Sequence, residues 1–302
     1  MRKILPAILA IFVISCSEPY DLQTGKSEKT YLCVEAALST LSGTQTVRLS
    51  ESVDYQSDDQ VPPVTGAKVE VSDGEQTYLF AERPGTPGSY DSPAGFLPSR
   101  GKTYTLNVEC TVDGSPRSCS ARSTMEEDGF DIEKIDCKNL GPGVDSTWVI
   151  GVWGQDRPQT SYFLITTAVN GVVSPATAML ERAMLMPDTY FNGSYVTGFP
   201  IGYLYQNARQ QQKYGACAKT LEKGDVVSLV VYSMTKDYYD FVLALSSASS
   251  AVSIPVISSQ PANLPTNLEG EDVMGYFAAC PVCISSCVID DPERTEWRSS
   301  VQ

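Results

Sequence analysis

Residues 101–124 read GKTYTLNVECTVDGSPRSCSARST and set the pattern for the first half of the chain. Tyr104, Leu106 and Val108 alternate with polar residues, and a second alternating run follows the segment Asp113-Gly114-Ser115-Pro116. Aspartate, glycine, serine and proline are typical turn residues. Alternation with a period of two indicates β-strands that bury one face. The stretch therefore predicts two antiparallel strands joined by a turn.

The same alternation recurs on the N-terminal side of this stretch. Short runs of it occur at residues 32–36, 47–49, 69–71, 77–82 and 89–91. Glycine, proline and aspartate separate the runs, and no helical periodicity competes with them. Short strands of this kind with frequent turns are typical of β-sandwiches. We therefore predict an immunoglobulin-like β-sandwich over residues 31–124.

An acidic, glycine-containing break at residues 124–130 separates this sandwich from a second predicted domain, residues 130–289. Strand-like apolar runs in the second domain occur at residues 148–153, 161–169, 221–233 and 273–279, the last of which we expect to close it. Residues 290–302 are interpreted as a polar tail. The expected fold class is mainly β, with a β-sandwich followed by a second β-rich domain.

One helix is predicted near residues 236–248. Thr235 is a suitable N-cap and Asp237 favours the first turn. Apolar side chains then recur at helical spacing, namely Tyr238, Phe241, Val242 and Leu245. We interpret this stripe as the buried face of the helix.

Several short motifs keep a fixed order along the chain. They are Gly66–Gly74, Gly88–Tyr90, Gly101–Leu106, Gly224–Leu229, Tyr238-Tyr239, Pro265–Leu268 and Gly275–Phe277. Together they resemble the lipoproteins of the Bacteroidota grouped as domain-of-unknown-function family 4249. The chain departs from that family at its end, where Asp290–Glu293 and Trp297 replace a Pro-Asp-Phe-Trp-like close. The resemblance implies an accessory lipoprotein associated with TonB-dependent outer-membrane transporters.

The N-terminus has the features of a bacterial export signal. Arg2 and Lys3 precede a short apolar run, and Val13-Ile14-Ser15-Cys16 resembles a lipobox. We expect residues 1–15 to be removed, Cys16 to carry a diacylglycerol anchor, and residues 16–30 to form a tether. Ser17-Glu18 resembles the acidic signals that send such lipoproteins to the outer face of the outer membrane, although a solvated linker also explains it. We therefore expect an outer-membrane protein, exposed at the cell surface if the first interpretation of Ser17-Glu18 holds.

Composition excludes several function classes. The net charge is −14, and it becomes −16 once Arg2 and Lys3 are removed with the signal. A surface this acidic repels nucleic acid, so we expect no nucleic-acid partner. The chain has no histidine, which excludes Ser-His-Asp and Cys-His catalysis and histidine-ligated zinc. We expect a protein that is not an enzyme and needs no cofactor.

Eight cysteines remain after Cys16, an even number that favours disulfides in an exported protein. If Asp113–Pro116 forms a four-residue loop, Cys110 faces Cys119 at about 4.5 Å between Cα atoms, which a disulfide can span. The C-terminal group Cys280, Cys283 and Cys287 is also interpreted as structural disulfides. A four-thiolate zinc site and a redox Cys280-x-x-Cys283 pair are the alternatives.

An aromatic stretch is the expected binding surface. It contains Tyr190, Phe191, Tyr195, Phe199, Tyr203 and Tyr205, interrupted by glycines. Tyrosine is enriched at interfaces because its ring supplies contact area and its hydroxyl group supplies orientation. The alternative interpretation is that Tyr203 and Tyr205 pack within a strand and that the other rings cover the edge of the core. A protein that binds a transporter or its ligand is the leading expectation; a surface adhesin that binds polymer, and a hydrolase that uses two carboxylates, are the alternatives.

Overall fold

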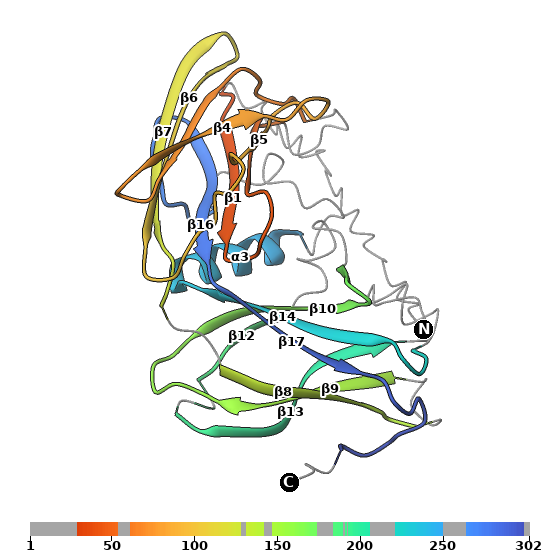
Figure 1. The fold of residues 1–302 in the computed structure, drawn as a ribbon. Coiled ribbons are helices and arrows are strands. Elements are labelled where there is room, and N and C mark those ends of the chain that lie inside the picture. Colours follow the sequence, from red (N-terminus) through yellow and green to blue (C-terminus); the bar gives the residue numbers. More distant parts are fainter. Residues whose placement is uncertain are drawn as a thin grey trace, which may run out of the picture.

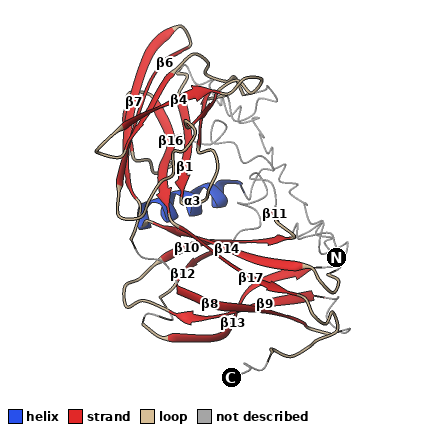
Figure 2. Ribbon diagram, viewed as in Figure 1, coloured by secondary structure: helices blue, strands red, loops and turns tan. Residues whose placement is uncertain are grey.

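The computed structural model describes residues 29–53, 61–127, 131–141, 147–173, 184–189, 191, 193–205, 221–249 and 264–298. These residues form seventeen strands and one helix, so the predicted mainly β fold is confirmed. The strands build three sheets, with the helix between the first sheet and the other two (Figures 1 and 2). Within the described residues, no helix has the length and apolar character needed to cross a membrane.

Nine strands form the first sheet, in the order β15-β7-β6-β3-β4-β5-β2-β1-β16. Their bounds are β1 (Leu32–Ser39), β2 (Thr46–Glu51), β3 (Lys68–Ser72), β4 (Thr77–Glu82), β5 (Ser89–Asp91), β6 (Thr103–Val112), β7 (Ser115–Thr124), β15 (Leu268–Gly270) and β16 (Val273–Cys280). Strand β4 connects two parts of the sheet: its residues 77–80 pair with β3, and its residues 81–82 pair with β5. The two end strands, β15 and β16, are consecutive in the chain, so the sheet nearly closes on itself.

This sheet encloses the first core. Inward side chains such as Val34, Phe80, Leu106 and Phe277 are 0–1% exposed. They include the alternating residues of the stretch 101–124, so that stretch does form a strand pair with one buried face. The immunoglobulin-like arrangement of the strands stays a prediction.

We expected strand β16 to close the second domain. It lies instead in the first sheet. It pairs in parallel with β1, from Leu32 opposite Val273 to Ser39 opposite Cys280. The segment before it supports this position, because the Asn267 side chain accepts a hydrogen bond from the Phe277 N–H and donates one to the Phe277 carbonyl. The first sheet is therefore completed by residues far beyond the predicted boundary at 124–130.

The turn between β6 and β7 is shorter than predicted. Asp113 and Gly114 alone form it, with φ values of 45° and 73°. Positive φ at both central residues suits the two-residue hairpin turn that matches the twist of paired strands. The register then places Cys110 opposite Arg117 and Cys119 opposite Val108. The prediction that Cys110 faces Cys119 is wrong for this reason, and both thiols are unbridged in the structure.

Two facing sheets form most of the second half (Figure 1). One contains β13 (Tyr195–Tyr205), β9 (Thr147–Gln155) and β8 (Asp131–Asn139) in that order. The other has the order β11-β10-β14-β17, with β12 also paired to β10. Its strands are β10 (Tyr162–Val169), β11 (Val172–Val173), β12 (Met184–Pro187), β14 (Val226–Met234) and β17 (Val282–Val288). Apolar side chains from both sheets form a shared core between them.

Helix α3 (Lys236–Ser249) joins the two halves. Thr235 caps it as predicted, since its Oγ1 accepts a hydrogen bond from the Tyr238 N–H at 3.3 Å. The apolar stripe of the helix is buried against the first sheet on one side and against β10 and β14 on the other (Figure 1). Because this core includes Cys33 and Tyr276 together with Leu164, the two halves pack through the helix.

Candidate functional site

The residues of the predicted aromatic surface lie on two different sides of the three-stranded sheet that contains β13. Phe191 and Phe199 lie against the core between the two sheets, with their ring centroids 4.5 Å apart. Tyr195 and Tyr203 point outward and are 50% and 42% exposed. Tyr190 and the side chain of Tyr205 lie outside the described residues. The aromatic stretch therefore does not form one surface.

Irregular pairing explains this division. The register between β13 and β9 shifts at Thr197/Phe199 and again at Pro200/Gly202. Gly198, at the first shift, has a φ of 62°. A bulge of this kind moves the following side chains to the other face of the strand. Strict alternation from Tyr195 would have placed Phe199 outside.

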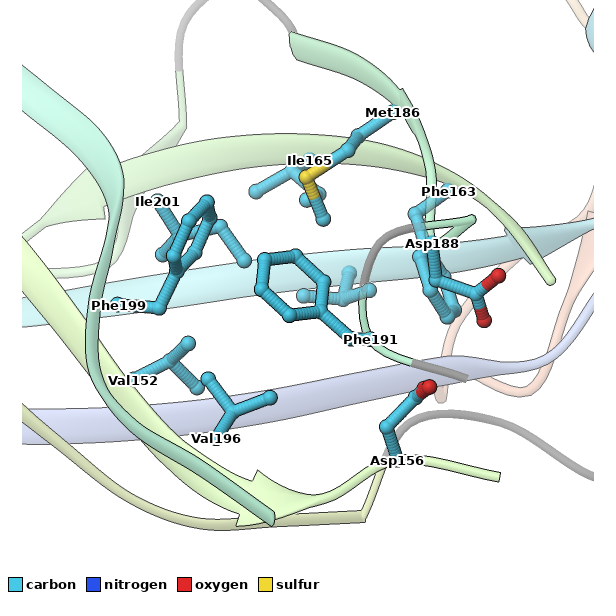
Figure 3. A pocket seen from close by; sticks show the side chains of 11 residues that line it. Val152, Asp156, Phe163, Ile165, Met186, Asp188, Phe191, Val196, Phe199 and Ile201 are labelled. Carbon is cyan, nitrogen blue, oxygen red and sulfur yellow. The ribbon is translucent and has the colours of Figure 1, made fainter. Parts of the chain in front are cut away.

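The inner aromatic residues line a small apolar pocket (Figure 3). Besides Phe191 and Phe199 it is lined by Val152, Phe163, Ile165, Met186, Val196, Ile201 and Val231. The open space measures about 10 Å³, which is the room that one water molecule needs. The pocket as it stands is therefore a packed core and has no room for an organic ligand.

Two acids lie together at one end of this pocket (Figure 3). Asp156 follows β9 and Asp188 follows β12, and they are only 2% and 1% exposed. The Ser161 N–H donates to Asp188 Oδ1 at 2.8 Å. The backbone of Arg157 and Gly193 favours the charged form of Asp156, although burial outweighs it. The Oδ2 atom of each acid has no N–H or O–H donor among the described residues.

Burial and the neighbouring acid change the pKa of Asp156. Burial, followed by the charge of Asp188, raises the pKa of Asp156 from 3.8 to about 6. Burial and a neighbouring like charge both disfavour the charged form of Asp156, so this residue holds a proton below that pH. Hydrolases that use two carboxylates need them roughly 5–10 Å apart on either side of a substrate. Asp156 and Asp188 are 2% and 1% exposed, beside a pocket with room for about one water molecule, so they do not match that arrangement.

The opposite side of the three-stranded sheet carries an aromatic surface. Tyr195 and Tyr203 lie opposite Gln155 and Val149, on the same face as Trp153. Trp297 packs edge-on against Trp153, with 5.4 Å between ring centroids, and Trp153 is left 9% exposed. We call these four residues the outer aromatic face: Trp153, Tyr195, Tyr203 and Trp297. The two tyrosines are its exposed members, and Trp297 covers Trp153.

Charged groups hold this face in place. Lys134 Nζ lies 4.6 Å from the Trp153 ring centroid, and Lys138 Nζ lies 4.5 Å from that of Trp297. The Tyr195 hydroxyl group donates to Glu133 at 2.6 Å. Cations over aromatic rings are attracted by the negative ring faces, so the lysines favour this arrangement of the indoles. Three residues of this face therefore lie on strands of the sheet, and Trp297 from the C-terminal segment packs against them.

The predicted polar tail contributes to the same surface. Arg294 donates to the buried Asp136 side chain at 3.0 Å and to the Cys137 carbonyl at 2.8 Å. Trp297 lies over Gly151, where a Cβ atom would be 2.7 Å from the indole. Only glycine at position 151 leaves room for the ring. No local sequence pattern predicts this requirement. Residues 290–298 are thus part of the folded structure.

The C-terminal cysteines do not form one cluster. Cys280 lies in the core beside helix α3, whereas Cys287 lies in the core between the two sheets. Burial raises the pKa of Cys280 to about 12, the opposite of the lowered pKa of a redox-active thiol. No group of three or more candidate metal-binding side chains occurs in the described part of the chain. Cys287 instead lies beside Cys137.

Two open hollows lie on the first sheet. Their volumes are about 390 and 520 Å³, and they share Glu109, Pro116, Arg117 and Ser118. Arg117 reaches Asp272 at 3.5 Å, so its charge is already partly satisfied. The hollows are shallow stretches of sheet surface rather than enclosed sites. Cys16, the predicted lipid site, lies outside the described residues.

Comparison with known proteins identifies the family. No curated protein matches the chain. A family model described as "Domain of unknown function (DUF4249)" matches residues 17–283, a span that includes strands of all three sheets. The match covers most of the chain, and the chain therefore belongs to the DUF4249 family, whose function is unknown.

Proposed function

We propose that this protein is a lipid-anchored binding component of the outer membrane or cell surface that works with a TonB-dependent transporter. The lipobox-like segment ending at Cys16 and the acidic mature chain support the anchored, exported location. The first half, predicted as an immunoglobulin-like sandwich, would act as a spacer between the anchor and the binding surface. The association with a transporter is inferred from the family resemblance alone.

The outer aromatic face is the surface that we assign to partner binding. The observation that carries this assignment is the exposure of Tyr195 and Tyr203 on one strand of a sheet, at 50% and 42%. Half-exposed tyrosines on a rigid support lose little entropy on binding and are enriched at interfaces. The internal pocket is the weaker candidate, because it has room for only about one water molecule.

Crosslinking in intact cells, followed by purification of the protein, tests this proposal. The wild type should recover a TonB-dependent barrel, and the double variant Tyr195→Ser/Tyr203→Ser should reduce that recovery about tenfold or more, as expected when hot-spot residues are removed. Leu79→Ser/Leu97→Ser is the matched control, because these exposed side chains lie in the first half. Equal recovery with both double variants, or no barrel with the wild type, would contradict the proposal.

A surface adhesin that binds polymer is the second candidate. The observation that favours it is the pairing of Trp153 with Trp297 beside the exposed tyrosines, since aromatic surfaces suit the apolar faces of sugar rings. A glycan array probed with the purified protein distinguishes the two. Binding that depends on Tyr195 and Tyr203, without recovery of a barrel from cells, would favour the adhesin.

A further inference from the structure

Two cysteines far apart in the sequence meet inside the second half. Cys137 lies in β8 of the three-stranded sheet, and Cys287 lies in β17 of the facing sheet. Their Sγ atoms are 3.1 Å apart. Cys137 is 0% exposed and Cys287 is 7% exposed. A bond between sulfur atoms is about 2.05 Å long, so a movement of about 1 Å would join them.

The surroundings hold both strands at this point. Arg294 donates to the Cys137 carbonyl at 2.8 Å, and the β17 register places Cys287 opposite Val227 of β14. The hydrogen bond between the two thiols lowers the pKa of Cys287. Cys287 is also the more exposed of the two, so it is the thiol that an oxidant reaches first. Both facts make Cys287 the first nucleophile.

We propose that Cys137 and Cys287 form a disulfide that joins the two facing sheets of the mature protein. The oxidant is another disulfide, either of a protein or of a small thiol. The Cys287 thiolate attacks one of its sulfur atoms and releases a first thiol. The Cys137 thiolate then attacks the mixed disulfide and releases the second. The two cysteines lose two electrons and two protons in total, and the oxidant is reduced to two thiols.

This bridge has a defined structural effect. It closes a loop between residues that are 150 positions apart, which restricts the unfolded chain strongly. It also fixes β17 beside β8, and the tail that carries Trp297 follows directly after β17. The outer aromatic face is therefore held to the opposite sheet by a covalent bond.

Peptide mapping without reduction tests the proposal. Full-length protein is reduced, treated with oxidised glutathione, denatured, alkylated and digested. The expected result is one linked pair of peptides containing Cys137 and Cys287, about 2 Da lighter than the two reduced peptides together. Alkylation of both cysteines, or a bond from either one to another cysteine such as Cys217, would overturn it.

Thermal unfolding supplies a second readout. Reduction should lower the Tm of the oxidised wild type by about 5–10 °C. The double variant Cys137→Ser/Cys287→Ser should show no such shift, whereas the control Cys110→Ser/Cys119→Ser should keep it. The same reductant shift in the Cys137→Ser/Cys287→Ser variant would place the responsible bond elsewhere.

In cells the bridge depends on export, which is part of the proposed function. The oxidation of purified protein does not depend on export. A bridge that forms with oxidised glutathione but is absent from protein isolated from cells would therefore count against the location and not against the pairing.

Discussion

The buried acids Asp156 and Asp188 give the protein a specific pH response. The pKa of Asp156 is raised to about 6, whereas it is 3.8 in its ordinary state. The folded protein therefore binds a proton more tightly than the unfolded chain does between these values. By linkage, the stability that this proton contributes is fully present below pH 3.8 and is lost as the pH rises through about 6.

Asp156→Asn should remove this response. The wild type should lose about 2–3 kcal/mol of unfolding free energy between pH 4 and pH 8 through this pair, and the variant should not. Urea unfolding at both pH values measures the difference. Glu269→Gln, at an exposed acid, is the control and should behave like the wild type. An equal pH dependence in the wild type and Asp156→Asn would contradict the assignment.

The buried Asp136 gives a second prediction about a single side chain. Asp136 is 3% exposed, and its carboxylate lies 3.0 Å from the Arg294 guanidinium group. Removal of the Asp136 charge would leave Arg294 without its buried partner. Asp136→Asn should cost about 3 kcal/mol of unfolding free energy. Asp290→Asn is the matched control, because Asp290 also pairs with Arg294 but is 55% exposed. That variant should cost less than about 1 kcal/mol in the same urea unfolding experiment.

Among the strands, the parallel contact between β1 and β16 depends on a glycine. Gly275 has a φ of 110°, and a Cβ atom there would lie 2.0 Å from the Val34 carbonyl oxygen. Only glycine allows the two backbones to approach in this way.

Gly275→Ala should therefore destabilise the first sheet by about 3 kcal/mol or more. Gly74→Ala is the control, because Gly74 also has a positive φ, 87°, but a Cβ atom added there would have no other atom within 4 Å. The control should cost about 1 kcal/mol, which is the cost of the backbone conformation alone. Thermal or urea unfolding compares the two, and equal losses would show that the contact with Val34 is not limiting.

Local patterns predicted the elements better than their partners. Alternation at Tyr104, Leu106 and Val108 identified a strand, and Thr235 identified the start of the helix, because both signals act over a few residues. Alternation does not say which strand lies alongside, so the pairing of β16 with β1 was missed. The division of the aromatic stretch was missed because a bulge at Gly198 changes the face of the strand without changing the composition.

The whole molecule is expected to depend on an anchor that precedes its folded part. Cys16→Ala should leave the described fold intact, since the described residues begin at residue 29. Two acyl chains supply stable membrane attachment that the acidic surface does not replace. In cell fractionation, Cys16→Ala should therefore lower the ratio of membrane-bound to soluble protein by more than about tenfold. Retention of the variant in the membrane would contradict the role of Cys16.

Long-range contacts limit what can be predicted from the sequence of such a molecule. Cys137 and Cys287 are 150 residues apart, and nothing in their spacing indicates that they meet. Trp297 reaches Gly151 only because the chain end folds back across the sheet. Such contacts follow from the assembled sheets, so they became visible only with the fold.

The position of β16 has a consequence for the order of assembly. A protein chain is synthesised from its N-terminus, so β1 is made before most of the folded part and its parallel neighbour β16 is made close to the end. Until then one edge of β1 has exposed backbone groups that other chains can pair with. Contacts between such distant segments form slowly, and partly closed sheets are prone to aggregation. The first sheet can therefore close only after synthesis has passed residue 280. A chain that ends before β16 keeps an unpaired edge on β1.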